Sequence, residues 1–209
     1  MARKTEDASK RPYSLGKRLE QSDLKRTRIL AVLREQLEAN GFTGLSLEGL
    51  AQVSGVTRQT IYNLFDTKTG LLEALFDQIA LEAGMERMRN VMTAASPDQM
   101  LQGFVEIFSA FWKKDRILIR RIHGIAAIDP EFGVAVEARN QRRRFAATRV
   151  IELLDRKSGD NADRDQRIAA LHALTSFEFF DAFAESCGDV DEAARMLPVI
   201  VRRTLMIQT

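Results

Sequence analysis

The sequence is poor in the residues that build disulfides and metal sites. Among its 209 residues there are one cysteine, Cys187, and two histidines, His123 and His172. A single cysteine excludes an internal disulfide and fits a reducing compartment, so we expect a cytoplasmic protein. The histidines lie far apart in the sequence, and a lone histidine is more often an ordinary core or surface residue than a ligand. We therefore expect no metal and no cofactor.

Long hydrophobic runs and catalytic constellations are missing as well. No apolar run approaches the roughly 20 residues that a helix needs to cross a bilayer. The N-terminus is polar and charged, unlike a secretory signal. There is no Gly-rich phosphate loop and no Ser/His/Asp spacing, so we expect neither membrane association nor enzyme activity. A hydrophobic content of 45% and a charged content of 29% are ordinary for a soluble globular protein.

Positive charge is unevenly distributed. The whole chain carries a net charge of only +2, but residues 1–68 contain 12 Lys/Arg against 8 Asp/Glu. Binding to nucleic acid phosphates requires such an excess. Alone, the asymmetry is also compatible with chance.

The most specific pattern begins at Gly41. Ser46 can cap a short helix whose apolar face carries Leu47, Leu50 and Val53. Gly55 stands where that helix must end, and glycine adopts the left-handed conformation of a helix terminus without steric cost.

A second short helix follows this turn. Thr57 can cap it, and its apolar positions are Ile61, Leu64 and Phe65. The open side of this helix is polar; its residues are Arg58, Gln59, Thr60, Tyr62 and Asn63. Two short helices, a tight glycine turn and a polar second helix predict a helix-turn-helix.

The same residues carry a family resemblance. The motifs Gly41-Phe42, Leu45-Ser46, Leu50-Ala51, Gly55-Val56-Thr57, Thr60-Ile61-Tyr62, Phe65, Thr67-Lys68 and Leu71-Leu72 resemble the DNA-binding domain of TetR-type transcriptional repressors. The match is dense over about fifty residues from Arg26. Beyond it, the resemblance is one of length and helical content.

The resemblance implies a set of DNA contacts. Base or neighbouring phosphate contacts fall on Arg58, Gln59, Tyr62 and Asn63, and phosphate contacts fall on Ser46, Thr60, Tyr62 and Lys68. The fork of an arginine suits guanine and a glutamine suits adenine. Glu48 departs from relatives that place a basic residue there, and we expect it to face solvent.

The remaining sequence predicts an all-α protein of about nine helices, with a three-helix DNA-binding domain and a larger C-terminal helical domain. We expect a flexible arm over 1–24, the DNA-binding domain over 25–72, and a ligand-binding and dimerisation domain over 73–209. A fourth helix is predicted from Thr67 to about Met92, and a single long helix from about Asp163 to Ser186. Ser96-Pro97 and Asp129-Pro130 are helix-start signals.

In the C-terminal half, aromatic side chains occur at helical spacing. In TetR-like proteins the corresponding helices enclose a ligand cavity, which makes these positions candidate pocket residues, although aromatics at this spacing are usually core. The aromatic candidates are Phe104, Phe108, Phe111, Trp112, Phe145, Phe177 and Phe180, with Phe132 nearby, and the aliphatic Ile122 is added to them. Glu178 and Asp181 lie in the same stretch and fit a ligand-orienting, interface or solvent role equally. The run Arg142-Arg143-Arg144 spreads around its helix, which favours a solvated surface or salt bridges.

The combined pattern predicts a homodimeric transcriptional regulator. It binds double-stranded DNA at a palindromic operator, and an apolar or amphipathic small molecule releases it. Activation instead of repression stays open. An enzyme with a DNA-targeting domain is disfavoured by the missing catalytic constellation, and a nucleoid-type structural protein by the polar set at Arg58, Gln59 and Asn63.

Overall fold

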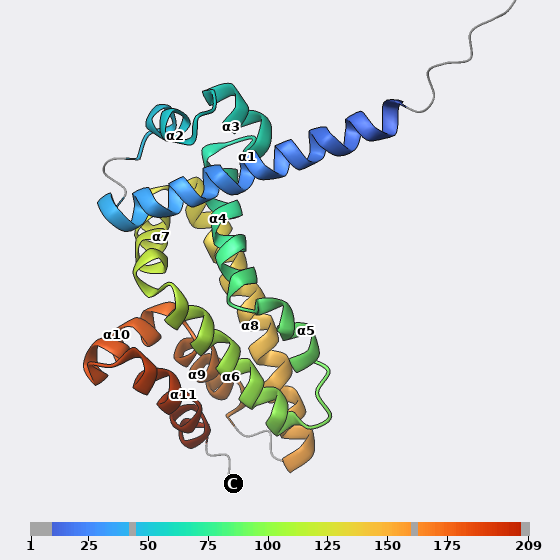
Figure 1. Cartoon of the computed structure of the whole chain (residues 1–209). Coiled ribbons are helices and arrows are strands. Elements are labelled where there is room, and N and C mark those ends of the chain that lie inside the picture. The colour runs from blue at the N-terminus through green and yellow to red at the C-terminus, as the bar shows by residue number, and fades with distance from the viewer. Residues whose placement is uncertain (1–9, 42–44, 160–162, 206–209) are drawn as a thin grey trace, which may run out of the picture. The chain divides into compact units, whose positions relative to one another are not determined.

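The computed structural model describes residues 10–41, 45–159 and 163–205, and in this part of the chain helices are the only regular secondary structure (Figure 1). It contains eleven α-helices and one 3-10 helix, so the all-α prediction is confirmed and the count of about nine was too low. The chain divides into two compact units, with the boundary between Leu75 and Phe76.

The first unit contains α1 (Lys10–Asn40), α2 (Leu47–Ser54), α3 (Arg58–Phe65) and the first half of α4 (Lys68–Glu82). Its core is a small set of aliphatic residues and one phenylalanine. The fully buried members include Ile29, Leu33, Leu37, Leu50, Ile61, Leu71, Leu72 and Leu75. Their spacing at three and four residues follows the helical period, which is why sequence periodicity located them.

The second unit begins with the rest of α4. There follow η1 (Met85–Arg87), α5 (Met88–Val91), α6 (Pro97–Lys114), α7 (Arg116–Ile128), α8 (Pro130–Ser158), α9 (Arg164–Leu174), α10 (Phe177–Cys187) and α11 (Val190–Thr204). Within this unit α6 packs against α11, α8 packs against α7 and α9, and α10 packs against α11. Phe104, Phe132 and Phe180 are the largest completely buried side chains of its core.

The first helix extends into the segment that was predicted to be an arm. Helix α1 covers Lys10–Asn40, so residues 10–24 of the predicted arm are helical, while residues 1–9 lie outside the described part. Over residues 16–24 the side chains are exposed, Leu19 and Leu24 among them, except for half-buried Ser22. Residues 16–24 therefore form no buried stripe, and a search for apolar periodicity misses this part of the helix. Its many Lys, Arg, Glu and Gln residues favour a helix by intrinsic propensity.

Two predicted long helices are each divided. Helix α4 ends at Glu82 and not near Met92, because Gly84 adopts a left-handed backbone with φ 79° and ends the helical run. The helix predicted over 163–186 is divided into α9 and α10. Ser176 caps α10 by accepting a hydrogen bond of 3.1 Å from the backbone N–H of Phe179.

The two Pro-containing start signals are confirmed. Ser96 caps α6 through the Gln99 N–H, and Asp129 caps α8 through the Phe132 N–H. In both helices proline occupies the first turn, where its missing N–H costs no hydrogen bond. Over the described residues, no helix combines the length and the apolarity that crossing a bilayer would need.

Candidate DNA-binding helix-turn-helix and ligand cavity

Helix α2 is positioned by the cap and the core residues that the sequence indicated. The Ser46 hydroxyl accepts a hydrogen bond of 3.0 Å from the Gly49 N–H, which satisfies one of the free donors of the first turn. Leu50 and Ala51 are buried against the first unit's core. Val53, predicted on the buried face, is instead 55% exposed, and Ser54 takes the buried position. The apolar face of α2 is therefore narrower than its sequence indicated.

The turn between α2 and α3 is set by Gly55. Its backbone is left-handed, with φ 67° and ψ 33°. This conformation lets the Gly55 and Val56 N–H groups bond the carbonyls of Gln52 and Ala51 at 3.2 and 3.0 Å. The last carbonyls of α2 are thereby satisfied within the turn, and α3 starts two residues later.

Helix α3 presents a polar side whose members already pair with one another. Arg58 donates to the Tyr62 hydroxyl at 3.2 Å, and Gln59 donates to the Asn63 amide oxygen at 2.9 Å. Arg58, Gln59 and Asn63 are exposed, and Tyr62 is half-buried. The hydrogen bond to Tyr62 raises the pKa of Arg58. These pairs one helical turn apart hold the side chains along the face that a groove would meet.

The remaining predicted contact residues lie at helix starts. Thr57 caps α3, and its hydroxyl is 2.9 Å from that of half-buried Thr60. Thr67 accepts a hydrogen bond of 2.9 Å from the Gly70 N–H at the start of α4, next to half-buried Lys68. Ser46, at the start of α2, is exposed. Helix starts leave backbone N–H groups free, and these suit phosphate.

One supporting residue was missed by sequence analysis. The Arg26 guanidinium donates to the Leu64 carbonyl at 3.0 Å and lies over the Phe65 ring, 4.7 Å from its centroid. It therefore holds the C-terminal end of α3 against α1. A positive charge there also complements the negative end of a helix. The sequence offered no local signal, because the two partners are 38 residues apart.

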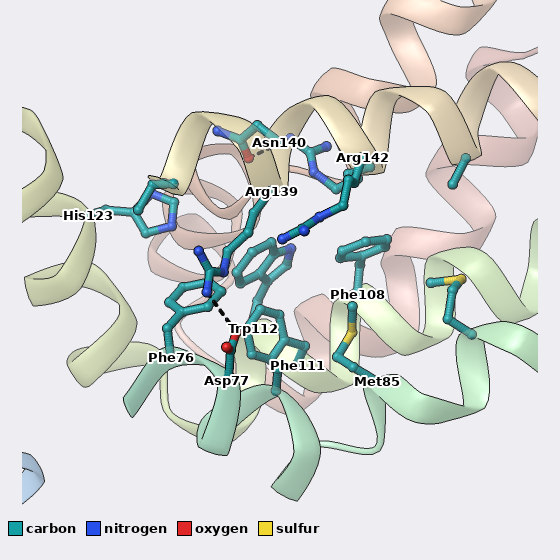
Figure 2. A pocket seen from close by; sticks show the side chains of 15 residues that line it. Phe76, Asp77, Met85, Phe108, Phe111, Trp112, His123, Arg139, Asn140 and Arg142 are labelled. Atoms are coloured by element: carbon teal, nitrogen blue, oxygen red, sulfur yellow. Dashed lines mark hydrogen bonds and ion pairs between the residues drawn. The ribbon is translucent and has the colours of Figure 1, made fainter. Parts of the chain in front are cut away.

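The second unit contains a cavity of about 230 Å³, shown in Figure 2. Its walls come from α4, η1, α5, α6, α7 and α8. The lining residues are Phe76, Asp77, Ala80, Met85, Met88, Phe108, Phe111, Trp112, His123, Val136, Arg139, Asn140, Arg142, Arg143 and Ala146. All of them belong to the second unit.

The predicted pocket residues separate into three groups. Phe108, Phe111 and Trp112 line the cavity. Core residues that do not line it are Phe104, Ile122, Phe177 and Phe180, all at least 96% buried. Phe145 is 76% exposed and does not line it, so its assignment to the pocket is not supported. Helical spacing placed Phe145 with the other aromatics, but the side of α8 that carries it faces away from the core.

Trp112 and Arg143 meet at the end of α9. The Trp112 indole donates to the carbonyl of Thr175 at 2.9 Å. Arg143 donates to the Thr175 hydroxyl at 3.1 Å and to the His172 carbonyl. Arg143 is only 6% exposed, so the expectation of a solvated surface or salt-bridge role for it is wrong. Desolvation lowers its pKa to about 10.

The two acids near the aromatic stretch pair with bases on α7. Glu178 accepts from His123 Nδ1 at 2.9 Å, and this bond lowers the pKa of Glu178 to about 2. The Asp181 carboxylate forms salt bridges with Arg116 at 2.6 Å and with Arg120 at 2.8 Å. Burial alone would raise the pKa of Asp181, but the two arginines bring it below its ordinary value. Neither acid lines the cavity.

His172, Cys187 and His123, whose roles the sequence did not decide, lie in different surroundings. Burial, together with the charge of Arg143, lowers the pKa of His172. Cys187 is a half-buried free thiol at the last residue of α10. His123 differs from both because it lines the cavity.

The arrangement of α2, turn and α3 defines a helix-turn-helix protein, and comparison with known proteins identifies the family. Residues 29–75 match the family model for bacterial regulatory proteins of the tetR family. The chain is 26% identical over 185 residues to the HTH-type transcriptional regulator EthR of Mycolicibacterium smegmatis. The aligned region covers 88% of this chain and 83% of EthR.

Solved structures share the fold. A putative transcriptional regulator from Pseudomonas aeruginosa PAO1 matches with a TM-score of 0.70 and 16% identity, over 88% of this chain and 92% of that one. NalD of Pseudomonas aeruginosa, the secondary repressor of the MexAB-OprM multidrug efflux pump, matches with a TM-score of 0.64 and 21% identity, over 88% and 96% of the two chains. Residues 29–75 therefore form a DNA-binding domain of the tetR family, and the chain is a DNA-binding transcriptional regulator. The relatives it matches are regulators and not enzymes.

Proposed function

We propose that this chain is a homodimeric repressor that binds a palindromic operator and leaves it when a small molecule occupies the cavity of the second unit. Residues 25–72 act as the DNA-binding domain, and residues 73–209 carry ligand binding and dimerisation. The observation that carries the proposal is the polar face of α3. Arg58, Gln59 and Asn63 are exposed together on the helix that follows the glycine turn, which is the helix that enters the major groove in helix-turn-helix proteins.

On DNA, the two sets of residues have different tasks. The N-terminal end of α3 enters the major groove, where Arg58 reads guanine and Gln59 reads adenine. Tyr62 and Asn63, one turn further on, contact bases or neighbouring phosphates. Ser46, Thr60, Tyr62 and Lys68 hold phosphates, which set the register of the protein without reading sequence. Binding breaks the Arg58–Tyr62 and Gln59–Asn63 pairs, which frees all four groups for DNA.

Two substitutions separate these tasks. Operator sites are first selected from random DNA with the full-length protein. Lys68→Ala should weaken binding to operator and random DNA alike and flatten the salt dependence. Arg58→Ala should relax preference at particular base pairs, by about 1–3 kcal/mol for each well-formed bond to a base that the substitution removes. Arg156→Ala removes an exposed arginine at the end of α8 and serves as the charge control.

The result can contradict the assignment in two ways. An equal loss on every sequence from Arg58→Ala would move Arg58 to the phosphate backbone. Equal affinity of the wild-type protein for operator and random DNA at matched salt would favour a structural DNA-binding protein over a sequence-specific regulator.

Release by a ligand would act through α4. Phe76, Asp77 and Ala80 of this helix line the cavity, and Lys68 at its other end is a proposed phosphate contact. A ligand that binds one arrangement of α4 more tightly than another shifts the population towards it, and with it DNA affinity. The repressor role of NalD supports repression here, since that protein shares the fold.

The dimer interface is proposed on α10 and α11. Met196 and Val199 of α11 are 39% and 49% exposed, which is unusual for apolar residues on so amphipathic a helix. Pairing would place two α3 helices in successive major grooves, about 34–36 Å apart. Val199→Asp should produce monomers in analytical ultracentrifugation at micromolar concentration, whereas Val134→Asp, at a 72% exposed position of α8, should not. A wild-type monomer that binds a half-site tightly would refute the dimer.

A further inference from the structure

The cavity of the second unit is chemically two-sided. Phe108, Phe111 and Trp112 of α6 form an apolar side, together with methionines from η1 and α5. The opposite wall is α8, which contributes Arg139, Asn140, Arg142 and Arg143. Figure 2 shows the labelled α8 side chains on one side of the space, with Phe76 and Asp77 of α4 across from them. A molecule in this cavity therefore contacts both an apolar surface and a row of arginine side chains.

The charge of the cavity is positive. Asp77 is the only carboxylate among the described lining residues, and it already accepts a hydrogen bond of 2.7 Å from Arg139. Arg143 is the most buried of the three arginines, and its hydrogen bonds go to carbonyl, hydroxyl and amide oxygens. Within the described ranges of the chain, its guanidinium forms no ion pair with a carboxylate. A buried cation without a carboxylate partner favours an incoming anion, because pairing offsets its desolvation.

A cationic ligand is disfavoured by the same geometry. An aromatic cage can hold a cation over its ring faces. Here Arg139 lies over the Phe76 ring at 5.1 Å from the centroid, and Arg143 lies over the Phe108 ring at 5.8 Å. The protein's own guanidinium groups thus occupy two of the ring faces, and a second cation would be repelled by them.

His123 adds a polar atom to the same cavity. Its Nδ1 bonds Glu178, while its Nε2 is buried and has no hydrogen-bond partner within the described part of the chain. A buried polar atom without a partner is destabilising, so a ligand that supplies one gains affinity. When protonated, the ring would donate from Nδ1 to Glu178 and from Nε2 to a ligand oxygen.

The volume limits the size of the ligand. An engineered cavity of about 150 Å³ holds benzene, so about 230 Å³ admits roughly nine to twelve non-hydrogen atoms. That range corresponds to a carboxylic acid of medium chain length or to a short acid with one aromatic ring. Both present the same chemistry, a single carboxylate on a compact apolar body.

We propose that the effector is a small amphipathic carboxylate whose apolar body packs on Phe108, Phe111 and Trp112 and whose carboxylate is bound by Arg143, with Arg142 and His123 beside it. This inference rests on the proposed ligand response and narrows it to one chemical class. It also assigns Arg143 a second role, because the same guanidinium holds the end of α9. Occupancy of the cavity is thereby connected to the junction of α9 and α10.

Three probes of nearly equal size test the charge preference: octanoate, 1-octanol and octylamine. Titration calorimetry and thermal shift on the full-length protein should show octanoate bound roughly ten- to a hundredfold more tightly than octanol, the range expected for charge-assisted hydrogen bonds. Octylamine should bind most weakly. Octanol or octylamine binding as tightly as octanoate would overturn the inference, and so would binding by none of the three.

Variants of α8 locate the carboxylate. Arg143→Met should lose most of the octanoate affinity and keep octanol affinity; Arg142→Gln is an exposed variant with the smaller expected effect and little risk to folding. Arg144→Gln is the control, since Arg144 is the next residue, is exposed and does not line the cavity. Unchanged octanoate affinity in both Arg143→Met and Arg142→Gln would refute the placement.

Operator binding distinguishes this inference from the proposed function. Octanoate that binds the cavity without releasing DNA would uphold the ligand class and contradict ligand release. Release by octanol or octylamine, with octanoate inactive, would uphold ligand release and contradict the anion preference.

Discussion

The backbone around Gly70 leaves no room for a side chain, so we expect the stability of the helix-turn-helix to depend on glycine at this position. A methyl group added at this position would lie 2.2 Å from the carbonyl oxygen of Phe65, the last residue of α3. A Cβ atom essentially never lies closer than 3.0 Å to another non-bonded heavy atom, so the two backbone segments must separate by about 0.8 Å. The obstacle is backbone and not a flexible side chain, and rotation of a side chain cannot relieve it.

The cost of Gly70→Ala follows from three contributions. Overpacking costs about 1–3 kcal/mol. Displacement of the Gly70 N–H from the Thr67 hydroxyl costs about 1 kcal/mol. The better helix propensity of alanine returns about 0.5–1 kcal/mol. We expect a net destabilisation of about 2 kcal/mol, which for a unit of this size lowers the melting temperature by about 10 °C.

The control is a glycine with open space around it. Gly16, in α1, has no atom within 4 Å of the position that a Cβ would take. Gly16→Ala should therefore leave stability unchanged or raise it by about 0.5–1 kcal/mol. Circular dichroism during heating measures both variants, and hydrogen exchange of α2 and α3 assigns the loss to the first unit. A melting temperature of Gly70→Ala within about 2 °C of wild type would refute the backbone-clash argument.

Three further outcomes are expected in the second unit. Trp112→Phe should destabilise it by about 1–3 kcal/mol in urea unfolding, because the buried Thr175 carbonyl loses its donor; a change under about 0.5 kcal/mol would contradict the bond. The pKa of Glu178 is lowered from 4.5 to about 2, so the stability that its pair with His123 contributes is present above pH 4.5 and is lost as the pH falls from 4.5 to 2. Glu178→Gln should flatten that part of the stability profile, and an unchanged slope would refute the pairing. Phe145→Ala should alter the melting temperature by less than about 2 °C, since its ring is 76% exposed, and a large drop would indicate a covered surface.

The DNA-binding half was the more predictable part. Its helix starts at Ser46 and Thr57, its turn at Gly55 and its core at Leu50, Ile61 and Phe65 were all found from the sequence. Each of these features depends on interactions a few residues apart, or on one periodic face. The burial of Ser54 in place of Val53 is the exception, because which side of α2 is covered depends on how its neighbours pack.

The cavity was predicted only in outline. Of the aromatic residues that helical spacing indicated, Phe108, Phe111 and Trp112 line the cavity, whereas Phe145 is exposed and does not. The basic wall on α8 was not anticipated. Three adjacent arginines look like solvated surface in a sequence, and nothing local shows that one of them turns inward.

What the sequence determined by itself is therefore the local structure: helix caps, the left-handed glycine turn and the apolar period, each governed by atoms close along the chain. What only the tertiary structure decided is the division between α9 and α10 and the burial of Arg143. Both depend on Thr175, which accepts hydrogen bonds from Trp112, 63 residues away in the sequence, and from Arg143, 32 residues away. The carbonyls at the end of α9 are satisfied by these distant donors, so the helix can end there. A donor so remote in sequence comes within bonding distance only after the helices have packed.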